Sequence, residues 1–180
     1  MLQESTLVII KADSVKRGLV GRILQKFEDI GLKITKLQLI VASEEQAQAH
    51  YAMGKDEKWL QAVGEKALSL YKSQSHAQKI FHSCNPIEIG KVIYQWSIKQ
   101  LTKKSIVVVV LYGPNAVEKV KKVAGSHMPA ELDLSTIRGM YSTDSLALSH
   151  AKRRALFNTI HRSTSRAEAK REISVWFPKE

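Results

Sequence analysis

The sequence predicts an α/β sandwich, in which a β-sheet packs against helices on one face. Segments 6–10, 33–41 and 105–112 are rich in apolar and β-branched residues, which is typical of strands. Segments with apolar residues at helical spacing lie between them. A chain of 180 residues is also long enough for one domain with a real core. The pattern leaves the order of the strands open.

Helix starts are marked by residues that can cap a helix N-terminus. Serine, aspartate and asparagine accept hydrogen bonds from free backbone N–H groups, and proline fits the first turn. The expected starts are Asp13-Ser14, Ser43–Gln46, Asn85-Pro86, Gly113–Asn115 and Ser165–Glu168. Gly31 and Gly125 are expected to end the first and fourth of these helices. Region 55–104 is helical in character.

The second half of the chain leads to a single histidine. Segment 105–112 is the most β-like of all and predicts a central strand. Segment 126–139 predicts a proline-containing loop, and 141–157 is expected to be mostly helical. A short strand at 157–160 is then expected to lead into His161.

A histidine and a glutamate near the C-terminus predict a reactive pair. On a helix from Arg166, Glu172 shares a face with Ala169 and Trp176, so its carboxylate is expected to point inward. A buried carboxylate needs a partner. His161 is the candidate, because a carboxylate on one ring nitrogen fixes the tautomer and raises the basicity of the other. The alternative is a purely structural histidine before a capped helix.

The composition indicates a soluble protein with anionic partners. The formal net charge is +11, which favours nucleotides, nucleic acids or acidic lipids. We find no arginine-rich tail and no aromatic motif of the RNA-binding type. No apolar run is long enough to span a bilayer, and the first residues do not resemble a secretory signal. The lone Cys84 fits a reducing compartment, so a cytoplasmic location is expected.

Several separated motifs, in the right order, resemble the nucleoside diphosphate kinase family over nearly the whole chain. They are Leu7–Asp13, Arg17–Gly21, His50-Tyr51, Thr136–Gly139, Asn158–His161 and Glu172–Phe177. The resemblance implies a single domain over residues 1–180, with a ferredoxin-like antiparallel four-stranded sheet and helices packed on it. Compared with compact members of the family, the chain has helical insertions at about 64–104 and 143–157.

The resemblance also implies an activity. The family transfers the γ-phosphoryl group of ATP or another nucleoside triphosphate to a nucleoside diphosphate, by a ping-pong mechanism through a phosphohistidine. His161 matches the phosphorylated histidine, Glu172 the carboxylate that orients it, and Ser163 a hydroxyl in the same hydrogen-bond set. Mg²⁺ is expected as the cofactor, bound mainly through substrate phosphates rather than by a protein cage.

Five further residues match the family's nucleotide-binding positions. Lys11, Tyr51 and Arg138 match groups that hold phosphates, and Asn158 matches an amide that contacts the ribose. Trp59 stands where the family has a phenylalanine that stacks on the base. Stacking tolerates base identity, which fits an enzyme that accepts all common nucleotides. From the local pattern alone, each residue is equally compatible with an ordinary surface or core role.

The chain departs from the family pattern at four positions. Lys121 replaces an arginine and keeps the charge without the bidentate fork. His127 replaces a phosphate-holding threonine, which would make nucleotide binding sensitive to pH. Ala12 replaces a proline, and Arg162 stands where many members have glycine, so it adds charge beside the nucleophile.

Three other expectations concern metals and partners. His76, His82 and Cys84 match no standard zinc spacing, so no dedicated metal site is expected. The resemblance implies a homo-oligomer, a hexamer or a tetramer. The excess of positive charge leaves an alternative function open, that of a catalytically weak relative that binds nucleic acid or protein.

Overall fold

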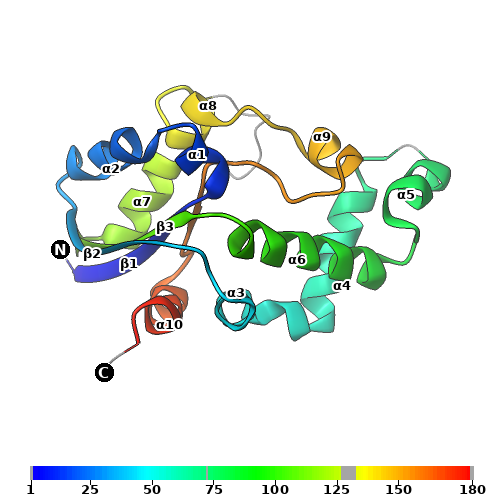
Figure 1. Cartoon of the computed structure of the whole chain (residues 1–180), viewed down its shortest axis with the longest axis horizontal. Helices are drawn as coiled ribbons and strands as arrows, with labels where there is room; N and C mark the ends of the chain where they lie inside the picture. Colours follow the sequence, from blue (N-terminus) through cyan, green and yellow to red (C-terminus); the bar gives the residue numbers. More distant parts are fainter. Residues whose placement is uncertain (1, 72, 127–132, 179–180) are drawn as a thin grey trace.

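The computed structural model describes residues 2–71, 73–126 and 133–178. Its centre is a four-stranded antiparallel sheet in the order β2-β3-β1-β4 (Figure 1). The strands are β1 (Gln3–Ile10), β2 (Lys33–Ile40), β3 (Ile106–Pro114) and β4 (Ile160–Arg162). This arrangement confirms the expected ferredoxin-like sheet. His161 lies within β4, where it pairs with Ile9, and not after the strand as predicted.

The helices lie on both faces of this sheet, which differs from the one-faced sandwich that the sequence pattern indicated (Figure 1). They are α1 (Ala12–Lys16), α2 (Val20–Glu28), α3 (Glu44–His50), the 3-10 turn η1 (Ala52–Lys55), α4 (Glu57–Leu68), α5 (Gln74–Phe81), α6 (Pro86–Thr102), α7 (Ala116–Ala124), α8 (Ile137–Tyr141), α9 (Leu146–Ala151) and α10 (Arg166–Trp176).

Alternation along the central strands explains the two covered faces. Successive side chains of a strand point to opposite sides. Val8 and Ile10 of β1 therefore join one core with α2 and α7, whereas Leu7 and Ile9 join a second core with α4, α6 and α10. A continuous apolar run is the pattern of a strand buried on both sides, and β1 and β3 both have it.

Three of the predicted helix caps are present. Ser43 and Gln46 form a reciprocal capping box at α3. The Asn85 side chain accepts hydrogen bonds from two backbone N–H groups of α6, whose first residue is Pro86. The Ser165 hydroxyl accepts from the N–H of Glu168 at the start of α10. These local bonds satisfy backbone groups that the helices would otherwise leave free.

Two predicted helices were wrong in extent. The helix expected from residue 13 to Gly31 is two helices, because Gly18 adopts a left-handed conformation (φ 69°) that an α-helix cannot contain. Segment 141–157 contains only α9 and the end of α8. Its residues 152–157 form no helix, and Arg153 among them also has a positive φ.

The segments expected to be insertions lie on one side of the sheet. Residues 64–104 contain the end of α4 and all of α5 and α6, and residues 143–157 contain α9. A small third core, formed by Ala67, Ala77, Phe81 and Ile89, holds α5 against α4 and α6. None of the helices in the described part of the chain is long and apolar enough to cross a membrane.

Candidate active site

The predicted histidine and glutamate are in contact. His161 Nε2 lies 2.9 Å from Glu172 Oε1, and the hydroxyl of Ser163 donates to the other carboxylate oxygen at 2.6 Å. Glu172 is 1% exposed, whereas the His161 side chain is 17% exposed. The inward direction of Glu172 follows from the helical spacing on α10. The carboxylate therefore holds one edge of the imidazole and leaves the other edge, with Nδ1, for a ligand.

Burial sets the charge of both partners. Burial, followed by the nearby Lys11 charge, lowers the pKa of His161 to about 3, so its imidazole is neutral at pH 7. Burial raises the pKa of Glu172, while the Ser163 hydrogen bond and the charge of Arg171 oppose that rise. A neutral imidazole whose Nε2–H donates to a carboxylate has its lone pair on Nδ1.

A second histidine, named in the sequence analysis only as part of the His50-Tyr51 motif and given no role there, packs against this pair. His50 is 1% exposed, and its ring meets the His161 ring edge-on with centroids 4.3 Å apart. The indole N–H of Trp176 donates to His50 Nδ1 at 3.2 Å. Burial lowers the pKa of His50 well below its usual value, so it remains neutral and limits the rotation of the His161 ring. Its sequence signals were its place in that motif and at the end of a capped helix.

Lys11 lies beside the histidine at the end of β1. Its ammonium donates to Asn158 Oδ1 at 2.7 Å, and its backbone N–H donates to the carbonyl of Thr159. Lys11 is 7% exposed. Burial lowers its pKa to about 8, with Asp13 opposing and Arg138 assisting that change. A buried ammonium group with a reduced pKa is a strong binding partner for an entering anion.

Two arginines complete the cationic end of the site. The guanidinium of Arg138, 5% exposed, donates to the carbonyls of Gly125 and Ile160 at 3.0 Å each, and more weakly to that of Asn158. Three of its five N–H groups are thereby used. Burial lowers its pKa to about 10. Arg162 follows the histidine directly, and its buried Nε has no hydrogen-bond partner. Both arginines line the same cavity as His161.

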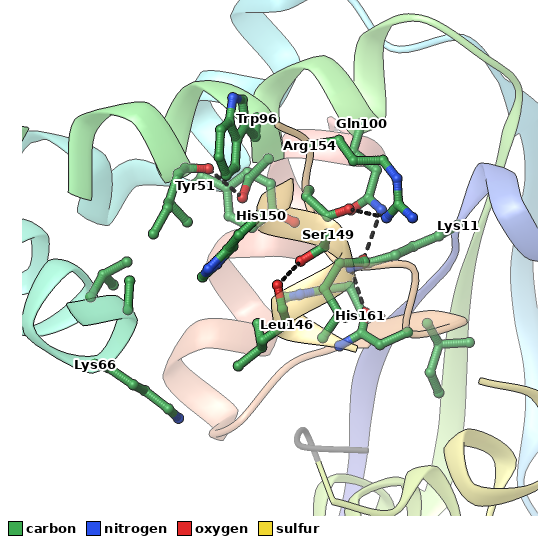
Figure 2. A pocket seen from close by; sticks show the side chains of 18 of the residues that line it. Lys11, Tyr51, Lys66, Trp96, Gln100, Leu146, Ser149, His150, Arg154 and His161 are labelled. Atoms are coloured by element: carbon green, nitrogen blue, oxygen red, sulfur yellow. Dashed lines mark hydrogen bonds between the residues drawn. The ribbon is translucent and has the colours of Figure 1, made fainter. Parts of the chain in front are cut away.

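This cavity has a volume of about 470 Å³ and joins the predicted residues. Its polar end contains Lys11, Arg138, Asn158 and His161. Tyr51 and Trp59 also line it, and burial raises the pKa of the Tyr51 phenol, which keeps it protonated. In Figure 2, Lys11 and His161 lie on one side of the cavity, and Trp96 and His150 lie on the other.

Two predicted nucleotide-binding residues are not placed in the cavity. Lys121 lies on α7 with its side chain 53% exposed, 3.7 Å from Glu118, and it does not line the cavity. Its role in binding remains a prediction. His127 lies outside the described residues. His76, His82 and Cys84 are exposed or partly exposed residues on and just after α5, which lies at the end of the molecule away from the sheet (Figure 1).

The metal-binding capacity of the site is limited. No aspartate or glutamate of the described chain lines the cavity. One oxygen of Glu172 and one nitrogen each of His50 and His161 lie within 4.8 Å of one another, but Glu172 and His50 already accept hydrogen bonds. The cavity therefore fits Mg²⁺ held through phosphate oxygens and water, since Mg²⁺ prefers oxygen ligands and needs few from protein.

The comparisons with known proteins agree with this geometry. The family model described as nucleoside diphosphate kinase matches residues 4–70 and 60–180. A nucleoside diphosphate kinase of Pyrobaculum aerophilum is 41% identical over 178 residues, 98% of this chain and 96% of the relative. One of Pyrococcus furiosus is 35% identical, over 98% of this chain and 84% of the relative.

Solved structures give the same result. A crystal structure of an NDP kinase from Pyrobaculum aerophilum has a TM-score of 0.90 and 39% identity, and the match covers 99% of this chain and 97% of that one. A nucleoside-diphosphate kinase from Borrelia burgdorferi, described as a transition state mimic with bound vanadate and ADP, has a TM-score of 0.76 and 27% identity. That match covers 99% of this chain and 89% of the Borrelia chain.

Proposed function

The chain belongs to the nucleoside diphosphate kinase family, and we propose that it transfers phosphoryl groups between nucleotides through a phosphohistidine at His161. It is thus a phosphotransferase that acts on nucleotides. The observation that carries the assignment of His161 is its contact with Glu172, which holds Nε2 and directs Nδ1 to the cationic end of the cavity. A merely structural histidine would not need a buried carboxylate beside a cluster of cations.

The proposed reaction has two half-steps. The Nδ1 lone pair of His161 attacks the γ-phosphorus of a nucleoside triphosphate, an N–P bond forms, and the bond to the β,γ-bridging oxygen breaks. The nucleoside diphosphate leaves with those electrons. A terminal oxygen of a second diphosphate then attacks the phosphorus and restores the imidazole. In the phosphohistidine intermediate the ring carries a positive charge, so its Nε2–H is more acidic than that of the neutral imidazole. The Glu172 carboxylate stabilises this charge.

Transfer of this kind depends mainly on position and neutralisation of charge. We propose that Lys11 and Arg138 bind phosphate oxygens, Tyr51 donates to them, and Asn158 contacts the ribose. Arg162 has a buried Nε without a partner and lines the cavity, so it supplies the cation that Lys121, on the surface of α7, does not bring there. Trp59 offers a face on which the base stacks.

Mg²⁺ is proposed as the cofactor. When bound, it neutralises charge on the phosphates and polarises the transferred group. No carboxylate of the described residues lines the phosphate end of the cavity, so the ion would be bound through the phosphates of the substrate. Lys11, Arg138 and Arg162, which line the cavity, would bind phosphate oxygens beside the ion.

The experiment is labelling with ATP that carries a radioactive γ-phosphate. We expect about one label per chain, lost in acid and retained in base, as a phosphoramidate requires. His161→Ala abolishes the label, whereas His76→Ala, which changes an exposed histidine on α5, retains it. Label that persists in the His161→Ala variant, or that survives acid, would show that another residue carries the phosphate.

We also propose that the chain forms a homo-oligomer through the free edge of β2. Leu37 and Leu39 of this edge strand are 48% and 65% exposed, and Val41, just after it, is 55% exposed. An exposed apolar strand edge is a template for pairing with another chain. Light scattering should give a mass that is a multiple of 20.2 kDa, and Leu39→Lys should reduce it. A wild-type mass of one chain contradicts the proposal.

We also propose a cytoplasmic location, because the lone Cys84 is a free thiol, which fits a reducing compartment.

A second function, binding of single-stranded nucleic acid, is favoured by one observation. A hollow of about 260 Å³ lies behind the wall of the active-site cavity, beside the partly exposed Phe157. Basic side chains without an ion pair among the described residues surround it: Lys16, Lys99, Lys103, Lys104 and Arg153. Cations beside an exposed ring suit a nucleic-acid strand.

The nucleic-acid function is tested by the dependence of affinity on salt. Binding to a random single-stranded oligonucleotide should weaken steeply as salt rises. Reversing the charge at Lys103 and Lys104 should weaken it further, with phosphoryl transfer unchanged. No binding at low salt, or binding that is insensitive to salt, rejects this second function.

A further inference from the structure

Arg171 connects α10 to the end of α3. It directly precedes Glu172 on α10, and its Nη1 donates to the backbone carbonyls of Ala49 and His50, at 2.8 and 3.0 Å. These carbonyls belong to the last turn of α3, and the last carbonyls of a helix have no partner within it. The C-terminal end of a helix also carries a partial negative charge, which attracts a cation. The end of α3 therefore anchors the guanidinium of Arg171.

The anchored guanidinium also faces the carboxylate that contacts His161. Nη2 of Arg171 lies 3.7 Å from Oε1 of Glu172, and the same oxygen lies 2.9 Å from Nε2 of His161. The Arg171 side chain is 37% exposed, whereas that of Glu172 is 1% exposed. Arg171 does not line the active-site cavity. It therefore reaches the buried carboxylate from the side away from the nucleotide and acts on the reaction only through other residues.

The other groups that face Glu172 carry no full charge at neutral pH. They are His161 on β4, Ser163 just after it, and His50 and Tyr51 at the end of α3. Burial lowers the pKa of both histidines and raises the pKa of the tyrosine, so all three side chains are neutral. Among the described residues, Arg171 is thus the one permanently charged group within 4.0 Å of this carboxylate.

A buried carboxylate depends on such a charge to stay ionised. Removal from water favours the protonated acid, and a nearby positive charge favours the carboxylate. Burial raises the pKa of Glu172, and the charge of Arg171 is one of the influences that oppose this rise. The ionised form is the one that stabilises a positively charged, phosphorylated imidazole. A group that keeps Glu172 ionised therefore supports catalysis without touching the substrate.

We propose that Arg171 is a positioning residue for phosphoryl transfer, which keeps Glu172 ionised and oriented toward His161. This inference rests on the proposed function, in which His161 carries the phosphate. The contacts run from the end of α3 to the guanidinium, from the guanidinium to Glu172, and from Glu172 to the imidazole. The positive charge carries the role, so lysine, which keeps the charge without the planar fork, should preserve the ionisation of Glu172.

The first test is the pH dependence of kcat in the full-length enzyme, with saturating ATP and GDP. Glu172 acts as a carboxylate, so activity is present above its pKa and is lost as the pH falls through it. Arg171→Met removes the positive charge and raises that pKa further. We expect the acid limit of kcat to move up by about half a pH unit or more. At pH 7, kcat should fall about three- to tenfold, with KM changed less than about threefold.

Two further variants separate the charge from packing. Arg171→Lys should return the acid limit to its wild-type position. Lys170→Met is the matched control, because it removes a positive charge from the adjacent, exposed position of α10, and it should change neither the acid limit nor kcat. An acid limit that stays in place in Arg171→Met, or that moves equally in Lys170→Met, overturns the proposal. A shift that Arg171→Lys does not reverse also overturns it, because the charge would then not carry the role.

The ionisation of Glu172 can also be measured without catalysis. The carboxyl carbons of glutamate are labelled with ¹³C, and the NMR signal of Glu172, identified by its absence in Glu172→Gln, is followed as the pH is changed. The midpoint should be higher in Arg171→Met than in the wild type, and equal midpoints overturn the proposal. If the midpoint rises in Arg171→Met while the wild type transfers no phosphoryl group, the proposed function fails and the control of Glu172 by Arg171 stands.

Arg171→Gln serves if Arg171→Met does not fold. It removes the same charge and keeps an amide that can donate to a carbonyl of α3. The midpoint of Glu172 should rise by a similar amount as expected for Arg171→Met. An unchanged midpoint in Arg171→Gln contradicts the proposal.

Discussion

The two ends of the active-site cavity are built in different ways. At the phosphate end, the key side chains lie on or next to the central strands and on α10, and buried polar bonds connect them: His161 to Glu172, Ser163 to Glu172, and Lys11 to Asn158. At the far end, the walls are α4, α6 and α9, which lie outside the sheet and touch the cavity mainly with apolar groups. One end is specified by hydrogen bonds, the other by helix packing.

This difference separates chemistry from stability. A change to one hydrogen bond at the phosphate end alters the reactivity of His161 and leaves the fold in place, because the sheet holds it. A change at the far end acts through the distance between helices, so it should mainly alter stability. The following predictions test this contrast, from the largest expected effect to the smallest.

Glu172→Gln should be the most damaging of these changes to catalysis. The neutral amide keeps the volume but cannot stabilise the charge on a phosphorylated imidazole. We expect kcat to fall by about 10²-fold or more, with the KM for nucleotide changed by less than threefold. Steady-state kinetics with ATP and GDP measure both values.

The control for this prediction is Glu28→Gln, on the exposed C-terminal end of α2. It should leave both constants unchanged. If Glu172→Gln raised KM and left kcat unchanged, the carboxylate would be serving nucleotide binding and not the histidine.

Gly64→Ala tests the packing of the far end. A Cβ at Gly64 of α4 would lie 1.9 Å from the backbone carbonyl oxygen of Pro86 at the start of α6, so the helices must separate. We expect a loss of about 2 kcal/mol in the free energy of unfolding, as for other overpacked sites. Urea denaturation measures the stability.

Gly21→Ala is the matched control, because a Cβ there meets nothing within 4 Å and α2 is regular at that position. Alanine should stabilise that helix by about 0.5–1 kcal/mol. A Gly64→Ala variant as stable as Gly21→Ala would mean that α4 and α6 are not in close contact.

The pKa of Lys11 should set the alkaline limit of activity. Its pKa of about 8 is lowered by burial, so the ammonium is charged below pH 8 and becomes neutral above it. The attraction for phosphate is present below that value and is lost as the pH rises. We expect kcat/KM, which reports the free enzyme, to fall about tenfold per pH unit above pH 8. In Lys11→Arg the side chain stays charged, so its profile should remain flat to pH 9. A wild-type profile that is flat to pH 10 contradicts this role.

Ser163→Ala should have the smallest effect. It removes one buried hydrogen bond to Glu172 and should cost about 1 kcal/mol of stability. Since that bond holds the pKa of Glu172 down, its loss raises the pKa further and moves the acid limit of activity to higher pH. The control is Ser174→Ala, at an exposed serine on α10, the helix that contains Glu172. It should change neither the stability nor the acid limit. An unshifted acid limit in Ser163→Ala would separate this hydroxyl from catalysis.

Local sequence signals predicted much of the fold, and their failures have physical causes. Caps at Ser43, Asn85 and Ser165 were found because they act within three residues of the chain. The break at Gly18 was missed because the apolar positions on both sides fit one helix, and a glycine's positive φ leaves no periodic signal. The apolar strands did not show which helices cover which face of the sheet, because their side chains are apolar on both faces.

The site shows the same limits. Glu172 was predicted because helical spacing placed it beside Trp176, but the contact with His50 joins residues 122 positions apart and depends on the tertiary fold. Lys121 was assigned by matching the family, and the structure places its side chain on the surface of α7. The far end of the cavity was not predicted at all, since its walls come from three helices that the sequence shows only as helical in character.

The most direct test of the central claim is the identity of the phosphorylated atom. The enzyme, with its histidines labelled with ¹⁵N, is treated with ATP, and the phosphorus–nitrogen coupling is measured by NMR at alkaline pH, with peptide mapping to locate the residue. We predict one phosphate per chain, on Nδ1 of His161, because Glu172 holds Nε2. Phosphate on Nε2 of His161, or on any other residue, would contradict the account.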